Sequence, residues 1–432
     1  MNSTVYADDV KLAPYWWEAA PRPALPRAAL PTKVDVAVVG SGYAGLSAAL
    51  TLARGGRSTL VFEDGLVGEG ASTRNGGLVG TGLKAPFGDL ISRLGLDRAK
   101  ALYGGARDAA DYLEDFIGRE GIDCHYHRGG RFLGAHAPGD YDRMAHDLEL
   151  QAQHLGAEFE MIANADQHRF VGSDHYHGGA LDYGCAATHP ALQHQGLLER
   201  ALEAGAVIVE HTPVTGIARG KVGFTITAGA ARVETRDVVV ATNGYTDRLS
   251  PWLHRRIIPI QSQMIATEPL APELLDRLLP GKHVFGDTCR LHHYYRRSPD
   301  RHRILFGGRA GANQTDPRRS GRHLYRRLAA LFPELAGVRI SHVWTGVTGY
   351  TFDGMPHMGV HDGIHYAAGF VGSGAAMALY LGHKVGLRVL GSREADNVFD
   401  TLNHPTRPLY YGKPWFLPFA IAYFGWRDSL RL

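Results

Sequence analysis

Cysteine is scarce in this sequence of 432 residues, which contains only Cys124, Cys185 and Cys289. An odd number of widely separated cysteines does not make a disulfide framework or a CxxC zinc site. The two HYH sequences, at residues 125–127 and 175–177, have no carboxylate or cysteine at a recurring distance that would complete a metal site. We therefore expect a protein of the reducing cytoplasm and no bound metal.

A dominant charge and a long apolar run are also missing. Lys and Arg number 46 and Asp and Glu 43, without a long basic run, so nucleic-acid binding has little electrostatic support. The acidic and aromatic start MNSTVYADDV lacks the pattern of a secretory signal. The apolar residues 414–426 include Pro418 and are fewer than the roughly 20 that span a bilayer. We expect no transmembrane segment there, but packing on the protein, with contact to a membrane surface as the alternative.

What is present begins with a nucleotide-binding pattern at residues 34–64. An apolar run typical of a buried parallel strand leads into the turn Gly40-Ser-Gly42-Tyr-Ala-Gly45, a helix, and a second strand that ends at Glu63. Gly40 permits the tight turn, Gly42 lets a diphosphate approach the backbone, and Gly45 lets the helix pack on the strand. The helix directs free N–H groups at the phosphates, and Glu63 is placed to bind a ribose. The pattern predicts a bound dinucleotide, NAD or FAD.

The loop that follows, GEGASTRNGG at residues 68–77, favours FAD. An NAD enzyme usually continues with another strand and helix, whereas this chain goes directly from Glu63 into glycines interrupted by Ser72, Arg74 and Asn75. Such a loop can run along an extended ligand, offering backbone N–H groups to its diphosphate and side chains to its ring system. A flexible surface loop is the alternative.

Two later segments extend the same fold. Residues 232–246 predict a buried strand that ends at Thr242-Asn243-Gly244. Residues 363–390 predict a strand, a second glycine turn at 369–374, and a helix whose N-terminus can stabilise negative charge on a reduced flavin. The sequence therefore predicts an α/β fold with a discontinuous, Rossmann-like FAD-binding domain.

These segments resemble the FAD-dependent D-amino-acid oxidase and sarcosine oxidase superfamily, and within it the gamma-glutamylputrescine oxidoreductase branch. The similarity runs over nearly the whole chain, through PYWWEAAP, GASTRNGG, GGALDYGCAATHP, VVVATNGYT, PIQSQMIATEPL, YYRRSPDRHRILFGGR, WTGVTGYTFDGMPHMG, AGFVGSGAAMA and TRPLYYGKPWFLP. The resemblance implies a substrate domain whose antiparallel sheet covers the flavin. It also implies that Val214 lies near the adenine, and that Trp344, Thr345 and Gly346 lie near the isoalloxazine.

The expected domains and cofactor contacts follow from this combination. The FAD-binding domain is expected at residues 30–88, 185–244 and 340–392, the substrate domain at 89–184 and 245–339, and surface-packed terminal extensions at 1–29 and 393–432. The residues expected at the cofactor are Gly40, Gly42, Tyr43, Ala44, Gly45, Glu63, Asp64, Gly70, Ala71, Ser72, Arg74, Asn75, Gly76, Gly77, Leu78, Val214, Thr242, Asn243, Gly244, Trp344, Gly346, Gly372, Ser373 and Gly374.

Departures from the resemblance bear on how the flavin is held and reoxidised. Some relatives tether FAD through a His where this chain has Asn75, and sarcosine oxidases use a Cys near the segment that corresponds to residues 351–359, which holds none here. FAD is therefore expected to be noncovalent. Sarcosine oxidases also carry a flavin-facing Lys on the strand resembling RILFGGR, where our register puts Leu305, so slow reoxidation by oxygen is expected.

The resemblance implies oxidation of a C–N bond in a secondary amine or gamma-glutamyl amine, by hydride transfer to flavin, with hydrolysis of the imine. His189, His293 and His357 are candidates for positioning or catalysis. A five-residue loop at SPDRH would pair Tyr295 with Leu305 and put Tyr295 and His293 on the flavin face; simple sheet packing is the alternative for both.

Other functions stay open at this point. One is a dehydrogenase subunit that passes electrons to a protein or quinone, and another is a flavoprotein that binds without turnover. An NAD-dependent hydroxy-acid dehydrogenase is the least favoured. The sequence gives neither the amine nor the oligomeric state.

Overall fold

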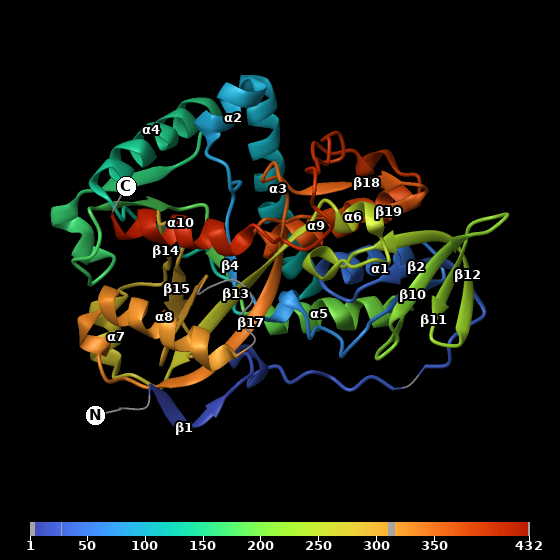
Figure 1. Cartoon of the computed structure of the whole chain (residues 1–432), viewed down its shortest axis with the longest axis horizontal. Coiled ribbons are helices and arrows are strands. Elements are labelled where there is room, and N and C mark those ends of the chain that lie inside the picture. Colours follow the sequence, from blue (N-terminus) through green and yellow to red (C-terminus); the bar gives the residue numbers. More distant parts are fainter. Residues whose placement is uncertain (1–4, 27, 310–315, 431–432) are drawn as a thin grey trace.

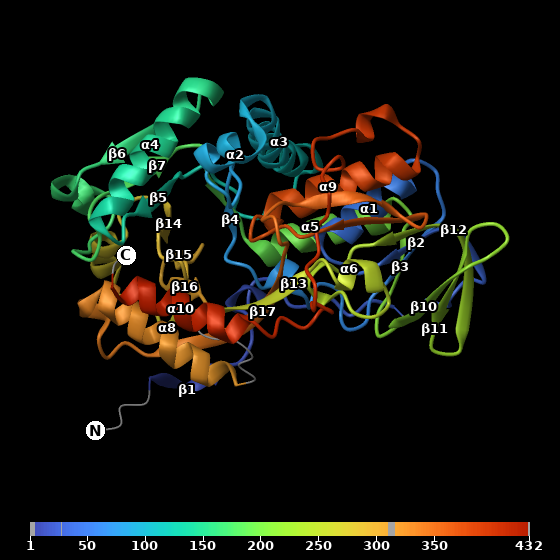
Figure 2. The same ribbon diagram turned by 45° about the horizontal axis from the view of Figure 1, so that its top comes forward.

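Two large β-sheets organise the computed structural model, which describes residues 5–26, 28–309 and 316–430 (Figure 1). One sheet is mainly parallel and lies among the helices α1 (Tyr43–Arg54), α5 (Pro190–Glu203) and α9 (Gly374–Val389). The other is mainly antiparallel and lies beside it, with α7 (Pro272–Leu278) and α8 (Pro317–Leu331) on its outer side (Figures 1 and 2). The α/β prediction with a discontinuous parallel sheet and a second, antiparallel sheet is confirmed.

The parallel sheet is assembled from three separate stretches of the chain. Its eight strands are β2 (Lys33–Val39), β3 (Thr59–Phe62), β9 (Val207–Val209), β10 (Val214–Arg219), β11 (Phe224–Ala228), β12 (Ala231–Val240), β18 (His357–His361) and β19 (Ile364–Ala368). The central strand β2 lies parallel to β3 and β12, and β19 lies parallel to β12. This arrangement puts the carboxyl ends of β2, β3 and β12 at one edge, where ligands bind in such sheets.

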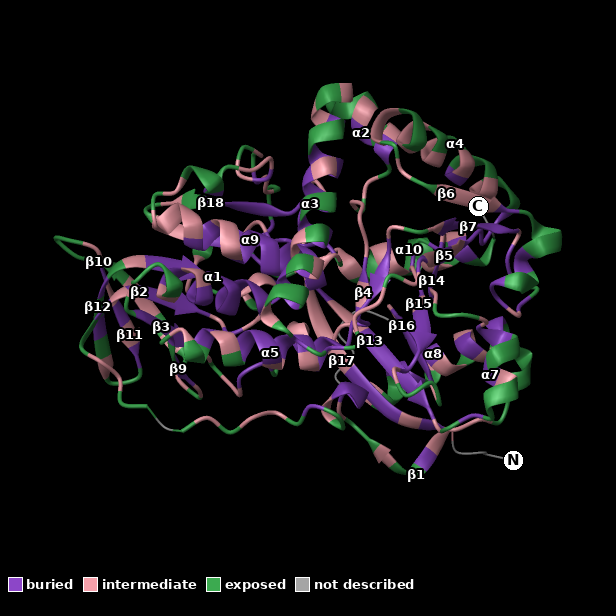
Figure 3. Cartoon of the chain, turned by 180° about the vertical axis from the view of Figure 1, so that it is seen from behind, coloured by how far each residue is buried: buried purple, intermediate pink, exposed green. Residues whose placement is uncertain are grey.

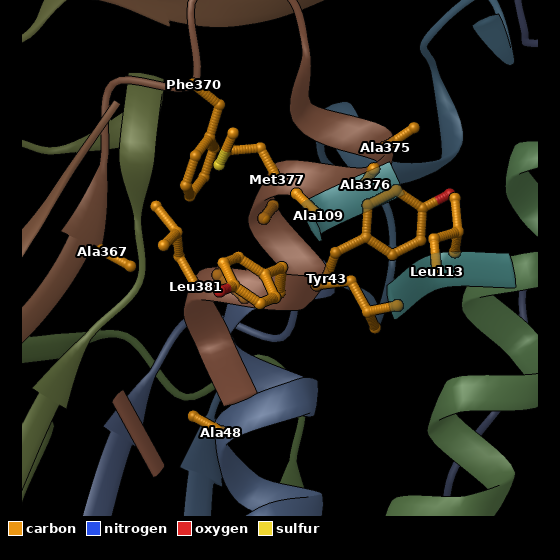
Figure 4. Close-up of a cluster of buried hydrophobic side chains, with 14 of the residues drawn as sticks. Tyr43, Ala48, Ala109, Leu113, Ala367, Phe370, Ala375, Ala376, Met377 and Leu381 are labelled. Atoms are coloured by element: carbon orange, nitrogen blue, oxygen red, sulfur yellow. The ribbon is translucent and has the colours of Figure 1, made fainter. Parts of the chain in front are cut away.

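Four helices with many small residues lie over the parallel sheet, two of them directly on its strands and the other two against those helices. They are α1 (Tyr43–Arg54), α3 (Leu96–Glu120), α5 (Pro190–Glu203) and α9 (Gly374–Val389). A Cβ at Gly382 of α9 would lie 2.3 Å from the Ala44 carbonyl oxygen of α1, so glycine lets the two backbones touch. Tyr43, Met377 and Leu381 fill the core around this contact (Figure 4). The half of the molecule that contains the parallel sheet is therefore held together by helices from distant parts of the chain.

Within the described residues, the second sheet has nine strands and lies beside the first. Their order is β1 (Tyr6–Lys11), β17 (Ile340–Tyr350), β13 (Ile258–Thr267), β16 (Ile304–Gly308), β15 (Tyr294–Arg297), β14 (Val284–Asp287), β5 (Arg131–Gly134), β7 (Gly179–Asp182) and β6 (Phe159–Ile162). The helices α7 (Pro272–Leu278) and α8 (Pro317–Leu331) cover one face over a buried apolar cluster. The opposite face is thereby left for the loop at 68–77.

The remaining elements are short or peripheral. They are α2 (Phe87–Leu94), α4 (Pro138–Leu155), α6 (Pro251–His254), α10 (Leu417–Ser429) and the small sheet of β4 (Leu78–Val79) with β8 (Ala186–Ala187). Figure 3 shows the buried strands inside and the exposed faces of α2, α4 and α7 outside. Among the described residues, no helix combines the length and the apolar character needed to cross a bilayer.

The N-terminal residues are part of the fold, whereas they were expected only to pack on its surface. β1 is an edge strand paired with β17, and Trp16 is fully buried. Residues 340–350 form β17, so this part of the segment expected in the FAD-binding domain belongs to the nine-stranded sheet. The parallel sheet resumes only at β18.

Candidate active site

The glycine turn after β2 has the geometry that its sequence predicts. Gly40 has φ +102°, which favours glycine, and a Cβ there would lie 3.1 Å from the Ala241 carbonyl oxygen. A Cβ at Gly45 would lie 1.8 Å from the Gly40 carbonyl oxygen, so α1 begins as close to the turn as backbone atoms permit. The start of α1 therefore presents its free N–H groups at the carboxyl edge of the sheet.

Glu63 lies beside this turn. Its carboxylate accepts hydrogen bonds from the Ser41 hydroxyl (2.6 Å) and the Ser41 N–H (3.0 Å). The Thr212 N–H donates to the Glu63 carbonyl oxygen (2.8 Å), which brings the start of β10 at Val214 to the same end of the sheet. Asp64, by contrast, is exposed. Glu63 and Val214 thus lie on the side where the resemblance expects the adenosine.

The loop at 68–77 covers the start of α1. The Ser72 hydroxyl oxygen accepts from the Tyr43 N–H (3.0 Å), and a Cβ at Gly42 would meet that oxygen at 2.9 Å. Ser72 therefore takes an N–H group that α1 cannot satisfy by itself. Gly70 and Ala71 precede it, and the Tyr245 ring lies 3.5 Å from an ideal Cβ on Gly70. The loop is rich in glycine where its backbone passes between the start of α1 and the Tyr245 ring.

Asn75 shapes the loop with its side chain. Its Nδ2 donates to the Ser72 carbonyl oxygen (2.9 Å), and its Oδ1 accepts from the Gly77 N–H (2.9 Å). Two tryptophans hold the adjoining backbone: the Trp16 indole N–H donates to the Asn75 carbonyl oxygen (2.9 Å), and that of Trp344 to the Arg74 carbonyl oxygen (2.8 Å). The side chain at position 75 is thus fully engaged in folding the loop.

The other predicted glycine segments meet at one place. The Asn243 side-chain oxygen accepts from the Gly369 N–H (2.8 Å), and it would lie 2.2 Å from a Cβ at Gly349. A Cβ at Gly244 would lie 3.0 Å from the Gly349 N. The structure therefore brings together the segments 242–244, 346–349 and 369–374, and Ser373-Gly374 opens α9 among them.

The nine-stranded sheet presents polar and aromatic groups to this region. The Tyr294 hydroxyl lies 2.8 Å from the Ser262 hydroxyl, and the Tyr294 ring lies 2.8 Å from an ideal Cβ on Gly76. Arg309 donates to the Tyr350 hydroxyl, and its guanidinium lies 4.7 Å from the centre of that ring. Tyr350 also approaches the Gly372 turn, with its hydroxyl 3.7 Å from an ideal Cβ there. These side chains therefore bridge the loop at 68–77 and the start of α9.

Lys84 adds positive charge to the same region. Its side chain is exposed, yet burial, together with Arg309 and Arg131, lowers its pKa to about 8. His292 is half-buried, and its pKa is lowered by burial and, less strongly, by Lys84.

The predicted pairing of the hairpin is wrong by one residue. Tyr295 pairs with Phe306 and Arg296 with Leu305, because Ser298 pairs with Arg303 and leaves a loop of four residues. Arg301 has φ +62° in this loop, and Asp300 accepts from the His302 N–H (3.2 Å). Leu305 consequently shares its face with Tyr294 and Arg296.

Tyr295 and His293 lie on the opposite face, among the residues under α8. Tyr295 is fully buried and stacks on Phe285, with the ring centres 5.0 Å apart. Its hydroxyl lies 3.1 Å from the Tyr176 hydroxyl. The His293 Nδ1 lies 2.7 Å from the Asp287 carboxylate. Tyr295 and His293 therefore pack within the sheet on the side away from the loop at 68–77, and the prediction that they line the flavin face is wrong.

Asp287, Cys289 and His293 place their ligand atoms within 4.8 Å of one another. The 2.7 Å contact between His293 and Asp287 is a hydrogen-bond distance, whereas two ligands of a tetrahedral zinc with bonds of about 2.1 Å are roughly 3.4 Å apart. Burial and the nearby Asp287 raise the pKa of the Cys289 thiol well above its usual value, which keeps the sulfur protonated. The geometry is that of a hydrogen-bonded cluster.

The other two histidines have structural partners. His357 is fully buried, bonds Asp353 at 3.0 Å and stacks on His404 with ring centres 4.0 Å apart. His189 caps α5, since its Nδ1 accepts from the Leu192 N–H (3.2 Å), and burial lowers its pKa to about 4. The His189 Nε2 is buried without a hydrogen-bond partner. The centre of the His189 ring lies 5.0 Å from that of the Trp16 ring. Of the three histidines expected from the sequence, His189 is the one with an unpartnered polar atom close to Trp16 and the loop.

Sequence reasoning missed four polar side chains of this region. Arg22 lies beside Gly68 and His194, and its Nε and Nη1 are buried without partners. Lys84, Arg309 and Tyr350 were not singled out either. Alternation along β16 from Leu305 would have placed Arg309 on the same face, whereas no pattern connects Arg22 or Lys84 to the site.

Comparison with known proteins agrees with this geometry. A family model described as FAD dependent oxidoreductase matches residues 35–386. The gamma-glutamylputrescine oxidoreductase of Escherichia coli (strain K12) is 32% identical over 406 residues, which covers 92% of this chain and 93% of that protein. The probable oxidoreductase OrdL of Rhizobium meliloti (strain 1021) is 31% identical over 398 residues, with 91% and 92% covered.

Solved structures share the fold. The crystal structure of glycine oxidase from Geobacillus kaustophilus superposes with a TM-score of 0.71 at 21% identity, covering 87% of this chain and 100% of that one. L-proline dehydrogenase from P. horikoshii gives a TM-score of 0.70 at 18% identity, covering 90% and 99%. With its glycine turn, loop and two sheets arranged as described, the chain belongs to the family of FAD-dependent oxidoreductases, as the sequence resemblance predicted.

Proposed function

We propose that this FAD-dependent oxidoreductase oxidises a C–N bond in an amine that carries a carboxylate, either a secondary amine or a gamma-glutamyl amine. The family fixes the cofactor as FAD and the substrates as amines or amino acids. The observation that carries the finer proposal is the group formed by Tyr294, Tyr350 and Arg309 between the loop at 68–77 and the start of α9. Aromatic rings and a cation there suit an alkylamine with an anionic end.

The residues present fit FAD. At Gly42 the absence of a side chain lets the Ser72 hydroxyl and the backbone approach the start of α1, whose N-terminus favours a diphosphate. Arg22, with two buried nitrogens free to donate, and Arg74 supply positive charge beside the loop. Glu63 would bind the ribose. Bound there, FAD supplies a hydride acceptor, which is chemistry that amino-acid side chains do not provide.

Side chains of this chain prepare the amine for oxidation. An alkylamine has a pKa of about 10 and must lose its proton before it can release hydride. Contact with the Tyr294 and Tyr350 rings removes water from the nitrogen and lowers its pKa. Arg309 and Lys84 hold the substrate carboxylate at a distance from that nitrogen. Trp344, Met264 and Leu305, all buried, exclude water from the sheet beneath. The imine product is then hydrolysed by water.

Neighbouring tyrosines on opposite faces of β15 provide the test. We expect Tyr294→Phe to raise the amine concentration needed for half-maximal flavin reduction under anaerobic conditions, and Tyr295→Phe to leave it unchanged. Arg309→Met should weaken the binding of a gamma-glutamyl amine far more than the binding of the same amine without the glutamyl group. Equal defects in the two tyrosine variants, or an equal loss for both amines in Arg309→Met, would contradict the proposal.

A second function, an amine dehydrogenase that reduces a quinone or protein, is favoured by Leu305. This residue is buried against Trp344 and Met264, where the resemblance expects the lysine of sarcosine oxidases. Without that charge, a superoxide-like intermediate loses an electrostatic stabiliser. Stopped-flow reoxidation that is slow with oxygen and fast with a quinone would support it, and fast oxygen reoxidation would refute it.

A further inference from the structure

The outer face of α10 carries a continuous apolar stripe, which we call the α10 stripe. It consists of Phe419, Tyr423, Trp426 and Leu430, with exposed fractions of 74%, 51%, 57% and 49%. The spacing of four, three and four residues puts them on one side of a helix. Their alignment is visible in the contact of Tyr423 with Trp426, whose ring centres lie 6.3 Å apart.

The inner face of α10 is fixed to the protein. The Asp428 carboxylate accepts from the Arg290 N–H (2.8 Å) and the Leu291 N–H (2.9 Å), and Gly425 faces Leu291. At the other end, Leu417 packs against the cluster around Tyr410. Because both ends are anchored, the outward direction of the stripe follows from the packing of α10 on the nine-stranded half (Figures 1 and 2).

The apolar surface continues before α10. Leu409, Tyr411 and Trp415 are exposed by 72%, 63% and 61%. Large contiguous apolar patches are rare on monomeric proteins and mark a surface that meets a partner or a membrane. Tryptophan and tyrosine combine an apolar ring with a polar edge, which suits the boundary between lipid chains and headgroups.

The charges around this surface identify the occupant. Between residues 405 and 430 the accessible charged side chains are Arg407, Lys413 and Arg427, whereas the acidic Asp428 is buried beneath the helix. A basic rim complements anionic headgroups. A second copy docking by the same face would bring basic rim against basic rim. We propose that the α10 stripe docks on the surface of an anionic lipid bilayer, lying in the interface rather than crossing it.

Vesicle flotation of the full-length, flavin-loaded protein tests this proposal. We expect it to float with vesicles of phosphatidylglycerol and phosphatidylcholine and much less with phosphatidylcholine alone. Trp426→Ser and Phe419→Ser should each weaken binding about tenfold or more, since each removes one large apolar side chain from the interface. Val222→Ser is the control, because Val222 is 87% exposed in the turn between β10 and β11.

Folding and self-association are followed on the same samples. FAD content and melting temperature of the variants must match the parent chain, which separates lost binding from lost folding; Trp426→Phe keeps an aromatic ring and should retain binding. Quenching of tryptophan fluorescence by brominated lipid should disappear in Trp426→Ser with Trp415→Phe. Absence of flotation with anionic vesicles, or a dimer that Trp426→Ser dissociates, would overturn the proposal.

Discussion

Two indole N–H groups position the loop at 68–77, and removing either should weaken FAD binding. Trp344 and Trp16 donate to the consecutive carbonyl oxygens of Arg74 and Asn75. Trp344→Phe or Trp16→Phe keeps an aromatic ring but leaves one of these partly buried oxygens without its donor. Such a loss costs about 1–2 kcal/mol. If the loop must be ordered to hold the flavin, that cost raises the dissociation constant of FAD about 5- to 30-fold.

The assay is titration of flavin-free protein with FAD, followed by quenching of flavin fluorescence. Trp252→Phe is the control, because Trp252 packs on His361 and Tyr366, away from the loop. The double variant Trp16→Phe with Trp344→Phe should lose less FAD-binding free energy than the sum of the losses in the two single variants, since both indoles hold one backbone segment. Unchanged FAD affinity in both single variants, with melting temperatures lowered, would refute a positioning role.

Three further results are expected. Gly42→Val should abolish FAD retention, because its side chain displaces the Ser72 hydroxyl from the start of α1, while Glu63→Ala should only weaken it; Gly42→Val purifying with full flavin would disprove the assignment. With Asn75 in place of a tethering histidine, acid precipitation should leave the yellow colour in the supernatant, and colour in the washed pellet would show a covalent link. Burial lowers the pKa of His194 to about 4 in the folded chain. Between pH 6.5 and pH 4 this imidazole is therefore protonated in the unfolded chain but neutral in the folded chain, and protonation favours unfolding. Urea stability should therefore fall from pH 6.5 towards pH 4 and be flat above, and His194→Gln should lessen that dependence; an equal slope in the variant would assign it to other groups.

The nucleotide end could be predicted from sequence because its signals are local. Gly40 is required by its own φ of +102° and Gly45 by its contact with the Gly40 carbonyl oxygen, and the apolar run into the turn identifies a buried strand. The contribution of the segments 242–244 and 369–374 was also expected, because each follows a predicted strand. Local backbone constraints of this kind are readable without a structure.

The substrate side could not be predicted in the same way. The face of Tyr295 depended on the length of one loop, and one extra paired residue, Ser298 with Arg303, moved every side chain of β15 to the other side. Arg22 and Lys84 reach the site from segments without regular spacing. Long-range packing, which no periodicity encodes, decides which side chains meet there.

Anaerobic mixing of the purified, FAD-loaded protein with a panel of amines tests whether this chain oxidises amines. We expect a carboxylate-bearing secondary amine or gamma-glutamyl amine to bleach the flavin, with one carbonyl product formed for each flavin reduced. If dithionite reduces the flavin but no amine does so, the assignment of this chain as an amine oxidoreductase is contradicted.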